Sequence, residues 1–312
     1  MQIDSRQLAA FAAVLREGSF EAAARSLHLT PSAVSQRIKL LEERLGRVLI
    51  RRAAPCTTTD AGQALQRHAQ QLQLLEAQAL APFGLAPDVG SRARRDAGPG
   101  LTRLPTRMPM PIAVNADSLA TWFAPALAAV NELHAVSFDL LVEDQDHSSE
   151  LLRQGRAMAA VTTDAVPVQG CTAVRLGAMR YVAVASPAFM AQHFAGGLSP
   201  AALAQAPCTV FNRKDALQTR FLRRLTRQAV QPPQHHVPST HGFIHAALHG
   251  LGWGMNPQVL VAPLLARGEL VELAPGMPLD VPLVWQHWRL DSDVMHLLTR
   301  SVRAAAATML HA

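Results

Sequence analysis

The sequence predicts an α/β protein in two unlike parts, an all-helical N-terminal part and a larger part in which strands and helices alternate. Apolar residues recur at helical spacing through the first 80 positions, whereas short apolar runs separate helical segments from residue 110 onwards. Charge divides the chain in the same way. Residues 1–109 hold 15 Lys and Arg against nine Asp and Glu, and residues 110–312 hold 14 of each. A basic part joined to a neutral one is typical of a polyanion-binding domain followed by a domain with another role.

Composition limits the class of protein. With 312 residues, 49% of them hydrophobic and 17% charged, the chain is long enough for two or three folded domains and is not disordered. Its N terminus has no long apolar run, and no later run reaches the roughly 18–20 residues needed to span a bilayer, so a soluble cytoplasmic protein is expected. Cys56, Cys171 and Cys208 lie far apart without CxxC spacing, so they are expected to be reduced.

Two helices in close succession are predicted between Ser19 and Gly46. The first carries apolar residues at i, i+3, i+4 and i+7 from Phe20, and the second starts at the N-cap candidate Thr30 with Pro31 in the first helical position. The inward residues of the second helix are Val34, Ile38, Leu41 and Leu45. A tight turn between two helices, the second with an exposed polar face, is the helix-turn-helix arrangement that reads a DNA major groove. The alternative is a helical hairpin whose polar face is only solvated.

The polar face and the following run provide the candidates for DNA contact. A strand-sized segment, two arginines, a proline turn and three threonines follow Gly46 and predict a two-stranded wing. Arginines in a wing would contact the phosphate backbone, and the alternative is a solvated hairpin. The predicted DNA-binding residues are Thr30, Ser32, Ser35, Gln36, Arg37, Lys39, Arg51 and Arg52.

A long helix is predicted from Asp60 over residues 60–84, because the segment has high helix propensity. Its apolar residues alternate in steps of four and three, which predicts the seam of a two-chain coiled coil. The seam residues proposed to pair two copies are Leu65, Leu72, Leu75 and Ala79. Residues 85–109 are rich in Gly, Pro and Arg without periodicity and are expected to be a hinge.

The alternating elements beyond residue 110 predict a sheet flanked by helices, in which ligands bind at the C-terminal ends of the strands. Strands are expected at 110–116, 136–142, 157–162, 180–185, 208–211 and 281–288. Ser118 follows the first strand and opens a helix, so its hydroxyl and the N–H of Leu119 form a candidate carboxylate site. The alternative is that Ser118 is only an N-cap.

Acidic residues follow three predicted strands and could bind the amine groups of a cationic ligand. Asp117 and Asp164 follow the first and third strands, and Glu143, Asp144 and Asp146 follow the second. The alternative for each is a solvated loop carboxylate. Further candidates from the second half of this part are Arg213, Asp215, Ser239 and Thr240.

The run FAAVLREGSFEAAARSLHLTPSAVSQRIKLLEERLGRVLIRR, followed by TTTDAG, is similar to the LysR-type transcriptional regulators, and the resemblance covers the whole chain. In the second part, AVNADSLATWF, FNRKD, GLGWGMNP and LDVPLVWQHWRL resemble the arginine- and lysine-responsive branch of that family. The segment PSTHGFIHAALHG departs from the pattern through its extra histidines.

The resemblance implies a winged helix-turn-helix over residues 1–59, a dimerising linker helix over 60–84, a hinge over 85–109 and a two-lobed effector domain over 110–312. That last domain would be similar to periplasmic solute-binding proteins. The implied function is sequence-specific transcriptional control by lysine or arginine, governing basic amino acid export or related genes. Implied partners are double-stranded operator DNA, a second copy or a tetramer, and RNA polymerase, with no membrane, cofactor or enzymatic activity.

Two rival interpretations remain from the residues themselves. His241, His245 and His249 share one helix face, which could present two metal ligands, although no Cys or HExxH glutamate accompanies them. A regulator that binds another ligand, or a metal at this histidine face, is the alternative to one that binds lysine or arginine. A metal-dependent enzyme is a weaker alternative. A solute-binding protein is disfavoured by the basic N-terminal part. GLGWG lacks the full GxGxxG pattern and a Walker lysine, so a turn beside the cleft is favoured over a phosphate site.

Overall fold

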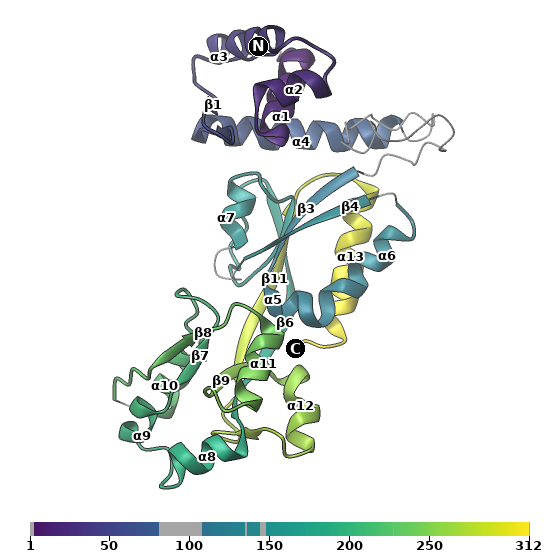
Figure 1. The fold of residues 1–312 in the computed structure, drawn as a ribbon. Coiled ribbons are helices and arrows are strands. Elements are labelled where there is room, and N and C mark those ends of the chain that lie inside the picture. Colours follow the sequence, from purple (N-terminus) through teal and green to yellow (C-terminus); the bar gives the residue numbers. More distant parts are fainter. Residues whose placement is uncertain (1–2, 81–107, 135, 144–147, 227, 312) are drawn as a thin grey trace, which may run out of the picture.

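The computed structural model describes residues 3–80, 108–134, 136–143, 148–226 and 228–311, and most of the predicted hinge at 85–109 lies outside them. Figure 1 shows a helical N-terminal head, the long helix α4 below it, and a two-lobed α/β domain. The predicted fold class is therefore confirmed. Among the described helices, none is both long and apolar enough to cross a membrane.

The head is a winged helix-turn-helix. Side-chain caps start its helices: Asp4 accepts from the N–H of Arg6, Ser19 from Ala22 at 3.1 Å, and Thr30 from Ala33 at 3.2 Å. Its elements are α1 (Ser5–Glu17), α2 (Phe20–Ser26), α3 (Pro31–Leu45), β1 (Ile50–Arg51) and β2 (Thr57–Thr58). The buried core includes Phe11, Val14, Val34, Ile38 and Leu41, as the periodicity of the first and third helices requires.

The linker helix α4 (Asp60–Leu80) corrects the predicted dimer seam. Leu65 is only 7% exposed and packs in the head's own core, with Leu72 partly buried against the same core, so Leu65 is not free to pair with a second copy. Leu75 is 42% exposed, and Ala79 is exposed as well. The exposed positions of α4 include Ala64 and His68 as well as Leu75 and Ala79, so the outward face keeps two of the predicted seam residues but not Leu65.

A seven-stranded mixed sheet runs through both lobes in the order β10-β6-β11-β5-β3-β4, with β9 paired to β6. We define lobe I as residues 108–177 and 283–311, and lobe II as residues 178–282. In lobe I, β3 is parallel to both β4 and β5. The elements of lobe I are β3 (Met108–Val114), α5 (Ala116–Ser118), η3 (Leu119–Phe123), α6 (Ala124–Asn131), β4 (Val136–Val142), α7 (Ser148–Arg153), β5 (Ala159–Thr162) and α13 (Asp293–Ala307).

Lobe II carries shorter elements around a smaller core that includes Val184, Ile244 and Val261. Its elements are α8 (Pro187–Phe194), α9 (Pro200–Gln205), β7 (Cys208–Val210), α10 (Leu217–Leu225), β8 (Gln234–His236), α11 (Thr240–Leu248), β9 (Gly254–Pro257), α12 (Gln258–Ala266) and β10 (Val271–Glu272). A Cβ on Gly254 would lie 2.2 Å from the Thr209 hydroxyl, so the last glycine of GLGWG is needed where β9 approaches β7. This turn is a packing feature.

Two antiparallel strands, β6 (Cys171–Ala185) and β11 (Leu279–Trp288), cross between the lobes. Their register shifts between Leu283 and Val284, opposite Gly177, whose φ of 125° is disfavoured for other residues. The sequence predicted only residues 180–185 of β6, in which 181–185 form a continuous apolar run that is buried, whereas the residues before them are mostly half-buried.

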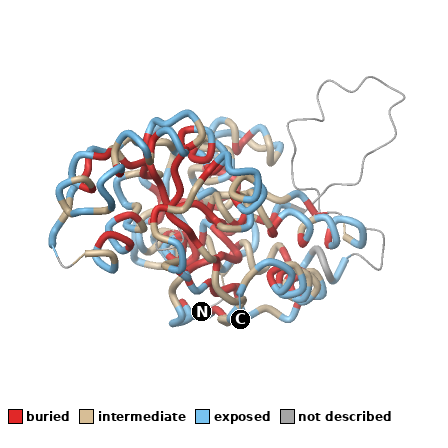
Figure 2. The backbone as a smooth tube through the Cα atoms, turned by 90° about the horizontal axis from the view of Figure 1, so that it is seen from below, coloured by how far each residue is buried: buried red, intermediate tan, exposed pale blue. Residues whose placement is uncertain are grey.

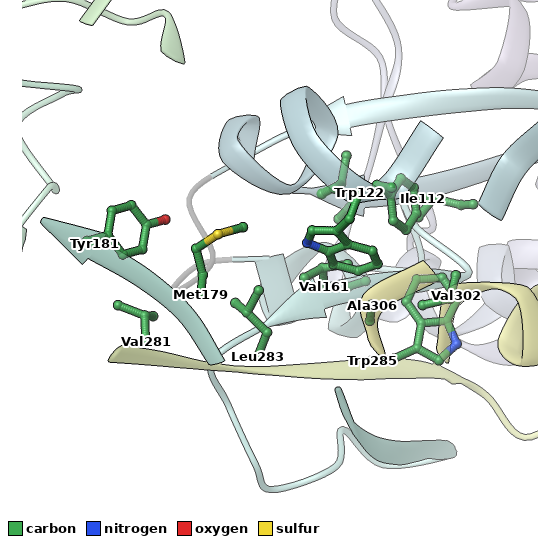
Figure 3. Close-up of a cluster of buried hydrophobic side chains, with 14 of the residues drawn as sticks. Ile112, Trp122, Val161, Met179, Tyr181, Val281, Leu283, Trp285, Val302 and Ala306 are labelled. Atoms are coloured by element: carbon green, nitrogen blue, oxygen red, sulfur yellow. The ribbon is translucent and has the colours of Figure 1, made fainter. Parts of the chain in front are cut away.

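Most of the apolar core lies along the central strands, which are buried in Figure 2. Figure 3 shows Trp122 from η3 and Trp285 from β11 within this core, close to Val302 of α13. Trp122 is 1% exposed and Trp285 is fully buried, so these aromatic side chains pack the lobe and do not line a ligand site.

Candidate functional site

A cavity of about 100 Å³ lies between the two lobes. Lobe I contributes the residues after β3 and β4, and lobe II contributes the 211–217 segment, the start of α11 and the end of β9. These are the ends at which α/β sheets bind ligands. The polar residues of its wall are Asn115, Asp117, Glu143, Asn212, Asp215, Thr240 and Asn256.

Asp117 joins both lobes at this cavity. Its Oδ1 accepts a 2.7 Å hydrogen bond from the Thr240 hydroxyl of lobe II, and its Oδ2 accepts one of 2.7 Å from the Tyr181 hydroxyl of β6. Burial raises the pKa of the Asp117 carboxyl, the two hydroxyl donors oppose this shift, and the nearby Asp215 charge adds to it. The carboxylate is thus held in place but poorly solvated.

Two more carboxylates face the same cavity. Asp215 accepts from the backbone N–H groups of Phe211 at 2.9 Å and Leu217 at 3.0 Å, which fixes the turn before α10. Glu143 of lobe I forms a 3.5 Å ion pair with Lys214 of lobe II. Of the described residues that line the cavity, none is basic.

Two buried amides add acceptor capacity to this wall. The Oδ1 atoms of Asn115 and Asn256 are buried and have no hydrogen-bond partner within the described part of the chain. The amide nitrogen of Asn256 donates to the Gly254 carbonyl at 3.2 Å, so its free atom is the oxygen. A site with three carboxylates and two unpaired amide oxygens is suited to a ligand rich in N–H donors and positive charge.

The predicted start of the helix at Ser118 is wrong, and so is the alternative that Ser118 is its N-cap. The helix begins two residues earlier, at Ala116, with Asn115 in the N-cap position, so Ser118 lies inside the first turn. Its hydroxyl is fully buried and is not part of the cavity wall. The N–H of Leu119 already donates to the Asn115 carbonyl at 3.1 Å, so it is not available to a ligand carboxylate. The N–H groups earlier in the turn have no intrahelical acceptor.

Three other predicted effector residues do not reach the cavity. Asp164 pairs with Arg153 at 3.4 Å and accepts from the N–H of Val166. Ser239 is the N-cap of α11 and accepts from the N–H of Gly242, while Arg213 is exposed to solvent. Asp144 and Asp146 lie outside the described residues. Asp117, Glu143, Asp215 and Thr240 are the predicted residues that the fold brings together.

Sequence reasoning missed Asn115, Asn256 and Tyr181. Asn115 follows directly after β3 and could have been found from the rule that ligand groups follow strand ends. Tyr181 is the chain's only tyrosine, but its position in an apolar strand gave no signal that its hydroxyl meets Asp117, 64 residues away in the sequence.

The histidine face of α11 does not form a metal site of three or more ligands. His241, His245 and His249 are all exposed, and the rings of His245 and His249 stack with centroids 6.4 Å apart. Over the described residues, no group of three His, Cys, Asp or Glu side chains could hold a metal ion.

The exposed surface of α3 carries the predicted DNA-contacting side chains. Ser32, Gln36 and Lys39 are exposed, whereas Ser35 and Arg37 are half-buried. Thr30 is occupied as the helix cap, so its role is to set where α3 begins. Lys39 lies 3.6 Å from Glu43 in an exposed pair, which leaves its ammonium group accessible.

The wing is tied to α3. Oε1 of Glu42 accepts from the backbone N–H groups of Leu49 at 2.8 Å and Ile50 at 3.3 Å. Arg51 is exposed on β1, and the guanidinium of Arg52 lies 4.8 Å from the ring centroid of Phe20. The Glu42 bonds therefore fix the position of the two arginines relative to the exposed face of α3.

Known families match both parts of the chain. Residues 5–63 match the bacterial regulatory helix-turn-helix proteins of the lysR family, and residues 110–307 match the LysR substrate binding domain. The regulator LysG of Mycobacterium tuberculosis is 49% identical over 306 residues, covering 98% of this chain and 94% of that protein. The regulator ArgP of Pseudomonas aeruginosa is 44% identical over 304 residues, covering 97% and 96%.

Solved structures agree with these matches. The crystal structure of ArgP from Mycobacterium tuberculosis has a TM-score of 0.85 at 48% identity and covers 99% of each chain. Full-length LysG from Corynebacterium glutamicum, with bound effector Arg, has a TM-score of 0.77 at 37% identity and covers 99% of this chain and all of that one. Together with its winged head and two-lobed domain, these matches show that the chain belongs to the LysR family of DNA-binding transcriptional regulators, which are not enzymes.

Proposed function

We propose that the protein controls transcription in response to arginine or lysine, which binds in the cavity between the lobes. The observation that supports this most directly is the composition of the cavity wall: Asp117, Glu143 and Asp215 face it, and no basic residue is among the described residues that line it. A cationic side chain would relieve the repulsion between these carboxylates and the cost of burying Asp117. The effector Arg bound in the similar LysG structure has this chemistry.

The ligand's amine or guanidinium groups would bind among the three carboxylates and the amide oxygens of Asn115 and Asn256. Its carboxylate would bind the N–H groups of the helix that starts at Ala116, because the first N–H groups of a helix lack intrahelical acceptors. In this arrangement the ligand carboxylate is bound by residues that precede Ser118 and Leu119, and not by those two residues as the sequence predicted.

In the proposed assembly, α3 enters the major groove of operator DNA and the wing arginines contact phosphates. Two copies would pair through the outward face of α4, and two such dimers could form a tetramer. Genes for basic amino acid export are the proposed targets, and RNA polymerase is the proposed partner at the promoter. Since the operator lies in the cytoplasm, the protein would act there.

Calorimetry on the full-length protein tests the effector assignment. Arginine and lysine should bind, and norleucine, which lacks the side-chain charge, should bind at least tenfold more weakly, the equivalent of about 1.4 kcal/mol. Asp215→Asn should weaken arginine binding by about 1.5–3 kcal/mol if the carboxylate meets a charged group. Glu143→Gln, which removes the carboxylate charge that pairs with Lys214, should weaken arginine binding as well.

Asp164→Asn is the matched control, because this carboxylate also follows a strand but pairs with Arg153 away from the cavity. It should leave arginine affinity unchanged within about twofold, since an exposed ion pair contributes little. Equal affinities for lysine and norleucine would contradict the proposal, as would a stronger effect of Asp164→Asn than of Asp215→Asn.

A further inference from the structure

The linker helix α4 packs into two hydrophobic cores. Leu65 and Ala69 belong to the core of the head, whereas Leu74, 2% exposed, belongs to the core of the two-lobed domain. Figure 1 shows α4 lying between the head and lobe I. Because these residues lie on one continuous helix, a displacement of lobe I against α4 also changes the position of lobe I relative to the head.

Arg67 makes the polar contact at this junction. Its Nη1 donates to the backbone carbonyl of Gln169 at 3.3 Å, and its Nη2 donates to the carbonyl of Arg153. Arg153 ends α7, so its carbonyl has no donor within that helix. The planar guanidinium reaches both acceptors at once, which a single ammonium group cannot do in the same geometry.

The backbones also approach closely beside Arg67. Gly155, in the turn after α7, has a φ of 68°, and a Cβ there would lie 3.2 Å from the Cβ of Arg67. Glycine is thus favoured both by its conformation and by its contact with α4. The turn after α7 and the guanidinium contact form one interface, which we call the Arg67 clamp: Arg67, Arg153, Gly155 and Gln169.

One acceptor of the clamp belongs to a loop that a crossover strand holds. Gln286, fully buried on β11, accepts from the N–H of Val168 at 2.9 Å and donates to the carbonyls of Asp164 at 2.8 Å and Val166 at 3.0 Å. This loop leads directly to Gln169. Since β11 joins the two lobes, a change in the angle between them can move the loop through Gln286.

We propose that Arg67 is a positioning residue that clamps α4 to lobe I and passes a change in lobe angle to the DNA-binding head. The clamp rests on the contacts described above, and its signalling role rests on the proposed response to arginine or lysine. Without the two-point contact, the cavity still binds its ligand and the head still binds DNA, but neither responds to the other.

Amide hydrogen exchange on the full-length protein tests the clamp and the signal together. Without ligand, Arg67→Ala should speed exchange in residues 66–74 and 150–157 by about tenfold or more, because local opening becomes easier. Arg67→Lys, which keeps the charge but not the fork, should behave like Arg67→Ala. Arg267→Ala removes an exposed positive charge in lobe II and should change neither segment.

Adding arginine extends the experiment. In the wild type, exchange should slow around the cavity and change in α4 as well, whereas in Arg67→Ala the cavity should respond and α4 should not. Wild-type exchange in both segments of Arg67→Ala would overturn the clamp, and full rescue by Arg67→Lys would overturn the two-point contact. If arginine slows exchange around the cavity of the wild type but leaves exchange in α4 unchanged, the signalling role is overturned. If neither arginine nor lysine changes exchange around the cavity, the proposed function fails. The comparison of the wild type with Arg67→Ala without ligand still tests whether the clamp exists.

Discussion

The Thr240 hydroxyl donates a 2.7 Å hydrogen bond to Oδ1 of Asp117, and this bond joins lobe II to lobe I at the wall of the cavity. Asp117 also accepts from Tyr181 on the crossover strand β6. One carboxylate therefore takes part in the contact between the lobes and in the proposed ligand site. A ligand that bonds to Asp117 must share it with these hydroxyls or displace them, so binding and lobe angle are coupled.

The titration of Asp117 predicts how stability depends on pH. Burial raises the pKa of this carboxyl in the folded protein above its ordinary value of 3.8. Between those two pKa values the folded state binds more protons than the unfolded state, so the contribution of Asp117 to the free energy of unfolding falls as pH rises. At pH values below 3.8, the contribution of Asp117 to the free energy of unfolding is fully present.

Asp117→Asn cannot titrate and isolates this contribution. The unfolding free energy of the wild type minus that of Asp117→Asn should fall as pH rises through 3.8 and level off above the raised pKa. Urea unfolding of both proteins at a series of pH values measures the difference. A difference that rises across this window would show that hydrogen bonding to Thr240 and Tyr181 outweighs burial.

Two substitutions in the head should have different effects on DNA binding. Gln36→Ala, on the exposed face of α3, should cost about 1–3 kcal/mol at one operator position and relax the base preference there. Arg51→Ala, on the wing, should weaken binding to all sequences alike and reduce the salt slope by about one. Binding to a set of operator variants at several salt concentrations separates them. If Gln36→Ala weakens all variants equally, α3 does not read bases through this residue.

Leu65 and Leu75 should have opposite roles although both lie on the predicted seam. Leu65→Ala removes a side chain from the head's core and should lower the unfolding free energy by about 2–5 kcal/mol, with the dimer retained. Leu75→Glu places a charge on the exposed face of α4 and should produce monomers. Sedimentation equilibrium and urea unfolding read the two effects. A Leu65→Ala variant that dissociates without losing stability would restore the original seam.

The three cysteines should react at different rates. Burial raises the pKa of the Cys208 thiol to about 12, so almost none of it is the reactive thiolate near neutral pH. Cys171 is buried and its pKa is raised too, whereas Cys56 is only half-buried. A disulfide reagent should modify Cys56 in the native protein and the other two only on unfolding. Cys56→Ser is the control, and rapid native labelling of that variant would contradict the prediction.

Local sequence signals determined the head and many elements of the effector domain. The caps at Ser19 and Thr30 and the inward face of α3 depend on residues within a few positions of one another, and all are present in the structure. The bounds of β4 likewise match the predicted strand at 136–142. Short elements such as β8 and β10 were missed, because runs of two or three residues carry no periodicity.

Tertiary structure alone decided which polar residues share the cavity. Asp117 and Asp164 both follow strands of lobe I, yet Asp117 faces Thr240 across the cavity while Asp164 turns to Arg153. The sequence places both at the same edge of the sheet, but the direction of each side chain depends on partners far away in the chain. The same holds for α4, where periodicity identified the apolar positions and only packing decided that Leu65 faces the head and Leu75 faces outward. A repeating pattern specifies that a face is apolar, whereas the surface that covers it is set by contacts between distant segments.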